Sequence, residues 1–92
     1  MINENAQIER DHDILTSEID LDLGLLNIET GYYYTLDDIG KDIWDLIESK
    51  ISVESVVKSL LSEYDTDYDT CKNDVIELFE SLEEHSLVKI WR

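Results

Sequence analysis

Three consecutive tyrosines, Tyr32–Tyr34, lie between a turn signal and the start of a helical pattern. They follow Glu29-Thr30-Gly31, where Gly31 can take the positive φ that a tight hairpin requires. Aromatic residues followed by the β-branched Thr35 are typical of a strand. This segment therefore predicts a short strand that is entered from a hairpin and leads directly into a helix at Asp37.

Two more strands are predicted before the tyrosines. Ile14–Ile19 alternates loosely between apolar and polar residues, and Asp20 and Asp22 mark the turn that follows it. The partner strand is predicted at Leu23–Glu29. Together with Tyr32–Thr35, these segments predict an N-terminal, three-stranded antiparallel sheet.

The rest of the chain has helical periodicity. Asp37 or Thr35 is a plausible N-cap for a first helix, and Gly40 inside this helix is expected to allow a close approach to the sheet. Ser52 is predicted to cap a second helix. The apolar positions of these two helices are Ile39, Ile43, Leu46 and Ile47, and then Val53, Val56, Val57, Leu60, Leu61 and Tyr64.

A third helix is predicted over Tyr68–His85, and Leu87–Trp91 is predicted to add a last short strand. A run of strands followed by a run of helices favours an α+β fold over a parallel βαβ fold. Three short helices with strands at both ends predict a winged helix-turn-helix-like shape.

The net charge of −16, from 23 acidic and 7 scattered basic residues, argues against some partners. Nucleic acid and anionic membrane surfaces require clustered Lys and Arg, so neither is expected as a partner. The third helix, which would have to read DNA in a winged helix, is itself strongly acidic. A cationic peptide or a basic protein surface would be attracted. Alternatively, the acidity only keeps a small domain soluble.

The length of 92 residues predicts one domain, over residues 12–92, after a flexible N-terminus at 1–11. The chain has no 18-residue apolar run, so no membrane span is expected, and the N-terminus lacks the pattern of a signal peptide. A single cysteine, Cys71, fits a reducing compartment. The sequence thus predicts a cytoplasmic protein.

No pattern of catalytic or metal-binding residues stands out. Asp65-Thr66-Asp67-Tyr68-Asp69 copies the opening of a calcium loop, but Thr70 and Ile76 replace the required Gly and Glu. Capping of the third helix by Asp67 explains these acids more simply. The sequence therefore predicts a protein that is not an enzyme and has no metal or cofactor.

The tyrosine strand and the third helix suggest a binding groove instead. Advancing about 100° per residue places Ile76 about 100° from Val75, the centre of the apolar face, on the flank that also carries Lys72. Such an apolar residue can line a groove or can simply be exposed on its own. If Tyr32–Thr35 is an edge strand, its free backbone groups can pair with an extended peptide by β-augmentation.

The chain resembles the PqqD-like family over roughly Leu15 to Leu87. It departs from the family's pattern at Ser86, where Gly is frequent, and at Asp37, where Asn is common. The resemblance rests on Leu26–Gly40, Ile43-Trp44, Ser52-Val53-Glu54, Leu60 with Glu63-Tyr64-Asp65, Asp74-Val75, Leu78-Phe79 and Leu82.

The resemblance implies a recognition element for ribosomally made, post-translationally modified peptides. Such domains bind the leader of a precursor peptide, as an added strand, between the third strand and the third helix. They are not enzymes but present the precursor to a modifying enzyme or leader protease. The implied peptide-binding residues are Tyr32, Tyr33, Tyr34 and Thr35 on the strand, with Lys72, Asp74, Val75, Ile76 and Phe79 on the helix, whose peptide-facing flank stays open.

A lasso-peptide system is the favoured setting, in which the protein would hand the precursor to a leader protease. The alternative within the family is a peptide chaperone for a radical-enzyme pathway such as pyrroloquinoline quinone synthesis. Outside the family, the alternative is a general acidic protein-interaction module.

Overall fold

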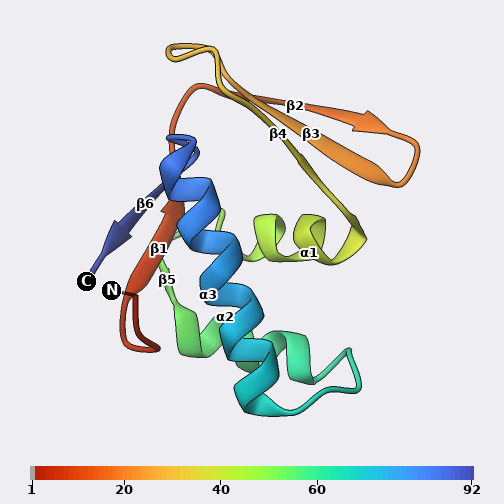
Figure 1. Ribbon diagram of the computed structural model, residues 1–92, viewed down its shortest axis with the longest axis vertical. Helices are drawn as coiled ribbons and strands as arrows, with labels where there is room; N and C mark the ends of the chain where they lie inside the picture. The colour runs from red at the N-terminus through yellow and green to blue at the C-terminus, as the bar shows by residue number, and fades with distance from the viewer. Residues whose placement is uncertain (1) are drawn as a thin grey trace.

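Residues 2–92, which the computed structural model describes, form two small antiparallel sheets and three helices (Figure 1). The fold is α+β and winged helix-turn-helix-like, as the sequence predicted. In chain order the elements are β1 (Gln7–Arg10), β2 (Ile14–Ile19), β3 (Asp22–Asn27), β4 (Tyr33–Leu36), α1 (Asp38–Leu46), β5 (Ile51–Ser52), α2 (Val53–Leu61), α3 (Tyr68–Glu84) and β6 (Val88–Trp91).

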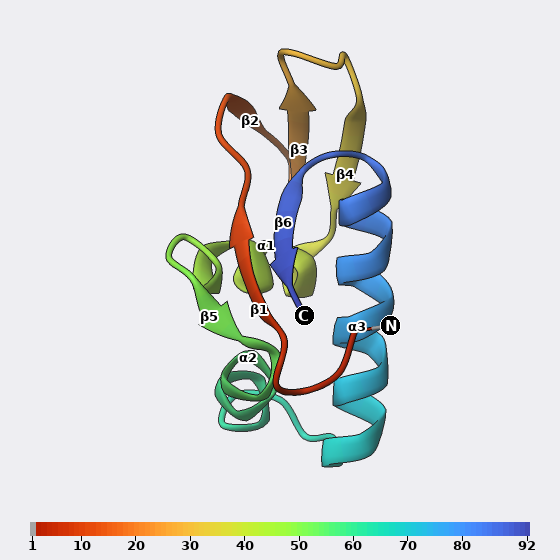
Figure 2. The ribbon, with the colours of Figure 1, turned by 90° about the vertical axis from the view of Figure 1, so that its left-hand side faces the viewer.

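The first sheet has the strand order β2-β3-β4 and contains the three strands that the sequence predicted. On β3 and β4, Leu23, Leu25 and Leu36 share the buried face of this sheet, which packs toward the helices. Leu25 lies opposite Tyr34 in the register, and Leu23 lies opposite Leu36. The tyrosine strand β4 is an outer strand of this sheet, at the side where α3 lies (Figure 2).

Asn27 anchors the turn between β3 and β4 and explains why β3 ends two residues earlier than predicted. Its buried side-chain oxygen accepts hydrogen bonds from the backbone N–H groups of Glu29 (2.9 Å) and Thr30 (3.0 Å). Its Nδ2 donates to the carbonyl oxygen of Ser86 at 2.6 Å, beyond the end of α3. Gly31 completes the turn at φ 79°, as expected from its position.

Replacing Asn27 by Ala should destabilise the fold by about 2–3 kcal/mol, because buried backbone groups lose their partners. Urea unfolding would measure this loss. Thr30→Ala is the matched control in the same turn, since Thr30 Oγ1 accepts only one exposed bond, from the Tyr32 N–H at 3.2 Å. A control variant as unstable as Asn27→Ala would contradict this role for the Asn27 side chain.

The predicted helix caps are confirmed. Asp37, Ser52 and Asp67 each accept a hydrogen bond from a backbone N–H three residues later. At Gly40, an added Cβ would lie 3.1 Å from Leu36, so the glycine allows α1 to approach the end of β4 closely, as predicted. Strand and helix thus meet at a tight corner.

The second sheet, with the order β5-β1-β6, differs from the prediction for the N-terminus. Residues 1–11 were expected to be flexible, but Gln7–Arg10 pairs with both β5 and β6, while Met1 lies outside the described residues. Ile2, Ala6 and Ile8 are buried in the core. These are the only three apolar residues between Ile2 and Arg10, too few to form an alternating pattern, which is why the sequence gave no signal for a strand here.

The core joins both sheets to the three helices. Phe79, Val75 and Leu82 of α3 are buried together with Val56 and Val57 of α2. The sequence predicted the last short strand, β6, and the structure pairs it with β1 in the second sheet. Within residues 2–92, no helix combines the length and the apolar character needed to cross a membrane.

Candidate functional site: a groove between β4 and α3

The free edge of β4 exposes backbone groups that can pair with another strand. The Asn27 N–H donates to the Tyr32 carbonyl oxygen at 2.9 Å, which fixes the alternation of the β3–β4 ladder. Tyr34 therefore bonds to β3, whereas the N–H and C=O groups of Tyr33 and Thr35 point away from β3. Within the described residues no strand pairs with this side of β4.

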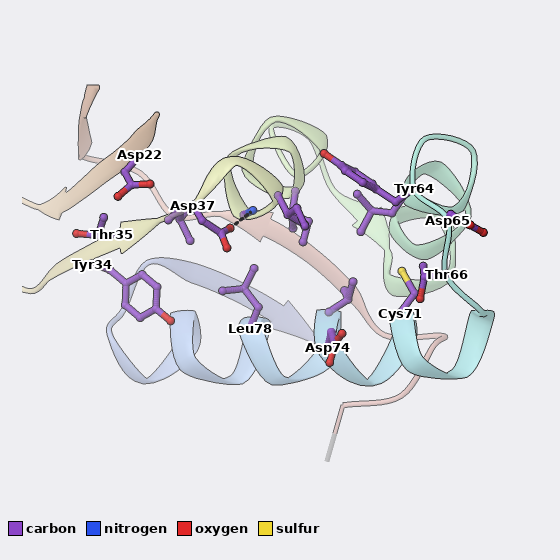
Figure 3. Close-up of a pocket in the computed structure, with 16 residues that line it drawn as sticks. Asp22, Tyr34, Thr35, Asp37, Tyr64, Asp65, Thr66, Cys71, Asp74 and Leu78 are labelled. Atoms are coloured by element: carbon purple, nitrogen blue, oxygen red, sulfur yellow. Dashed lines mark hydrogen bonds between the residues drawn. The ribbon is translucent and has the colours of Figure 1, made fainter. Parts of the chain in front are cut away.

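A cavity of about 760 Å³ lies beside this edge. Figure 3 shows β4 and α1 on one side of it, α3 on the other, and the loop between α2 and α3 at its far end. Its lining residues are Asp22, Tyr34, Thr35, Leu36, Asp37, Ile39, Gly40, Ile43, Leu60, Tyr64, Asp65, Thr66, Cys71, Asp74, Val75 and Leu78. A smaller hollow continues along α3, where it is lined by Tyr34, Asp74, Glu77, Leu78 and Ser81. We call these two hollows together the β4–α3 groove.

The structure indicates which flank of α3 borders the groove. Asp74, Val75 and Leu78 line it, whereas Lys72 and Ile76 do not. Relative to Val75, Leu78 lies about 60° and Asp74 about 100° around the helix on one side, and Ile76 lies about 100° on the other. The sequence left open which flank of the helix faces the peptide. In the structure, the flank of Asp74 and Leu78 borders the groove, and the flank of Ile76 does not.

The other three helix residues of the predicted site lie outside the groove. Ile76 packs against the hydrophobic core, and Phe79 is fully buried in it. The Lys72 ammonium lies 6.0 Å from the ring centre of Tyr68, away from the groove. Of the five predicted helix residues, the structure thus brings Asp74 and Val75 to the groove.

The three tyrosines have different surroundings. Tyr34 lines the groove, and its ring meets the His85 ring edge-on at 5.1 Å between ring centres. Tyr32 meets the same imidazole at 5.7 Å. Tyr33 points to the outer face of the sheet, where its ring covers Gly24. Because successive side chains of a strand alternate, the Tyr33 and Tyr34 side chains point to opposite faces of the sheet.

Sequence reasoning missed the apolar floor of the groove, formed by Leu36, Ile39 and Leu78. The sequence does place Leu78 at the edge of the apolar face of the third helix, on the flank opposite to Ile76. Ile39 remains 43% exposed although it belongs to the periodic stripe of α1. Nothing in the sequence distinguished these residues from ordinary core positions.

Tyr64 closes one wall of the groove, and its hydroxyl donates to a carboxylate oxygen of Asp42. This hydrogen bond raises the pKa of Tyr64 from its ordinary 10.0 to about 12. Because the pKa is raised on folding, the protonated hydroxyl stabilises the fold below about pH 10, and this contribution is lost as the pH rises toward 12.

A phenolate absorbance titration would test this assignment. The difference between the titrations of the wild type and Tyr64→Phe should have its midpoint near 12, because Asp42 holds the phenol proton. In Asp42→Asn the midpoint should move back toward 10.0. A midpoint that stays near 12 in Asp42→Asn would show that Asp42 is not the cause.

In the segment that copies the opening of a calcium loop, Asp67 has a structural role. Asp67 caps α3 as predicted, through the N–H of Thr70 at 2.8 Å, and this bond lowers the pKa of Asp67. Cys71 is buried at the groove wall, and burial raises the pKa of its thiol. Within residues 2–92, no group of three or more His, Cys, Asp or Glu side chains is placed to hold a metal ion.

The fold and the groove define a class of protein, a winged-helix-like domain with an open strand edge beside a helix. The chain belongs to the PqqD family. The family model described as "Coenzyme PQQ synthesis protein D (PqqD)" matches residues 23–88, which confirms the resemblance found in the sequence. No curated protein matches the chain.

Two solved structures share the fold over nearly the whole chain. One is described as "TbiB1 in Complex with the TbiA(beta) Leader Peptide"; it has a TM-score of 0.79 and 28% identity, and the match covers 88% of this chain and 94% of that one. The other, "Lasso peptide synthetase B1 complexed with the leader peptide", has a TM-score of 0.77 and 24% identity, with 89% and 96% covered. At that identity, the second match supports the fold alone.

Proposed function

We propose that this protein is a non-catalytic recognition protein for the leader region of a ribosomally made precursor peptide. It binds the leader as an added strand on the open edge of β4, in the β4–α3 groove, and delivers it to a modifying enzyme or leader protease. The observation that carries this proposal is the unpaired edge of β4 beside a cavity of about 760 Å³.

Geometry supports this mode of binding. Backbone groups of Tyr33 and Thr35 point toward the added strand and supply sequence-independent hydrogen bonds. Leu36, Ile39 and Leu78 offer an apolar surface that selects side chains of the leader. A leader complex of a similar protein, at 28% identity, supports a peptide as the ligand.

A lasso-peptide pathway is the proposed setting, as the resemblance in the sequence favours, and the similar structure at 28% identity agrees with it in having a leader peptide as its ligand. The description of the family model favours synthesis of coenzyme PQQ as the second candidate. Both settings place the protein in the cytoplasm, with a leader peptide and a processing enzyme as partners and without nucleic acid.

The decisive experiment is an amide NMR titration with the leader of a precursor peptide encoded beside the gene. Saturable shifts should concentrate on Tyr33–Leu36 and on the Asp74, Leu78 and Ser81 flank of α3. Shifts confined to other surfaces would contradict the groove. If no neighbouring leader produces shifts, the protein is an acidic interaction module with another partner.

A further inference from the structure

The β4–α3 groove combines an apolar floor with acidic walls. Leu36, Ile39 and Leu78 contribute to the floor. Asp22 lies on the sheet side and Asp74 on α3, which are 52 positions apart (74 − 22) in the sequence but border the same cavity (Figure 3). Asp37 and Asp65 add two more carboxylates to the lining.

These carboxylates have no positive partner in the groove. Among the described residues that line it, none is Lys, Arg or His. The ion pairs within residues 2–92 use other acids, namely Asp11, Glu18, Asp45, Glu54 and Glu83. One carboxylate oxygen of Asp37 accepts a hydrogen bond from the N–H of Gly40. This neutral donor does not cancel the negative charge of Asp37. The negative field of the walls is therefore directed at whatever occupies the groove.

We propose that the groove selects leader segments in which an apolar side chain is flanked by Lys or Arg at the second residue before or after it. This inference rests on the function proposed above. In an extended peptide paired with β4, residues two apart point to the same face, so one face presents both the apolar and the basic side chains to the groove. Lys and Arg can lay their aliphatic stems on the apolar floor while their charged ends reach the acidic walls.

The same walls discriminate against acidic leaders. A Glu side chain at a flanking position would meet Asp22, Asp37 or Asp74 without a counter-charge, and such repulsion rejects a wrong partner. Because the groove is open to solvent, each attractive pair contributes modestly and weakens with salt. Charge thus tunes selection, while the β4 edge and the apolar floor supply binding.

Two sets of measurements test this proposal. The first uses short synthetic peptides of one length, each a Thr- and Val-rich strand with a central Leu, that carry Lys, Gln or Glu two residues on either side of the Leu. The Lys peptide should bind about fivefold more tightly than the Gln peptide, and the Glu peptide should bind most weakly. Raising the salt concentration should remove the difference between Lys and Gln. Equal affinities for all three would overturn charge selection.

The second set compares two double variants with equal net charge. Asp22→Asn with Asp74→Asn should lose about fivefold in affinity for the Lys peptide. The control, Glu48→Gln with Glu80→Gln, removes two exposed acids outside the groove and should bind like the wild type. Equal loss in both would show that only overall charge matters.

Failure of this inference is distinguishable from failure of the proposed function. If the precursor leader binds on β4 but the two double variants bind it equally, the recognition function stands and charge selection is overturned. If neither the leader nor any of the three peptides binds, both proposals are overturned.

Discussion

Replacing Leu78 by Glu is expected to weaken leader binding about thirtyfold or more while the protein stays folded. Leu78 is half-buried, contributes to the apolar floor from α3, and lines both hollows of the groove. The substitution removes an apolar contact, and it places a carboxylate beside Asp74 where the leader must be desolvated. Isothermal titration calorimetry with the precursor leader would measure the loss, and circular dichroism would report on the fold.

The matched control is Ile76→Glu, two residues earlier on the same helix. Ile76 is also half-buried, so both variants place a charge at the edge of the core, but Ile76 lies on the flank that faces away from the groove. Ile76→Glu should bind the leader like the wild type despite a similar loss of stability. The reverse result, with binding lost in Ile76→Glu and kept in Leu78→Glu, would place the leader on the other side of α3.

Thr35→Pro is expected to reduce leader affinity about tenfold or more. The N–H of Thr35 points to the open edge of β4 and not to β3, so proline removes a donor that only the leader would use. Proline is tolerated on an edge strand where the N–H faces solvent, so the sheet should stay intact. The affinity can be measured by calorimetry, and the β3–β4 pairing can be checked by NMR.

Thr35→Val separates the backbone from the side chain at this position. Valine keeps the N–H and the β-branched shape, so the leader should bind this variant with nearly the affinity of the wild type. If valine weakens binding as much as proline does, the Thr35 hydroxyl and not the strand edge is the important group. Leader binding by β-augmentation would then be contradicted.

Local signals in the sequence predict much of the fold. The helix caps and the hairpin turn depend on interactions within a few residues, namely those at Asp37, Ser52, Asp67 and Gly31. Such interactions can be read without knowing the rest of the chain. For this reason, the predicted strands and the third helix differ from the observed ones by only one or two residues at their ends, whereas α2 ends at Leu61, three residues before Tyr64, the last apolar position assigned to it. The strands β1 and β5 were not predicted.

The flank of α3 and the pairing of the N-terminus depend on contacts between distant residues. Helical periodicity places Ile76 and Leu78 on opposite edges of the same apolar face, but only the position of β4 decides which edge borders the groove. Likewise, Gln7–Arg10 becomes a strand because β5 and β6 lie on either side of it. No local pattern contains this information.

The bond from Asn27 to Ser86 has a consequence for the thermodynamics of recognition. It ties the turn that precedes β4 to Ser86, two residues after the end of α3, so the two walls of the groove are joined at this end. At this end of the groove, the bond restrains the separation of the walls before any ligand binds. The groove then loses less conformational entropy on binding than the peptide does, which loses about 1–2 kcal/mol for each residue that becomes ordered. If the protein has the function proposed above, a short recognition segment keeps this entropy loss small and leaves the rest of the leader free.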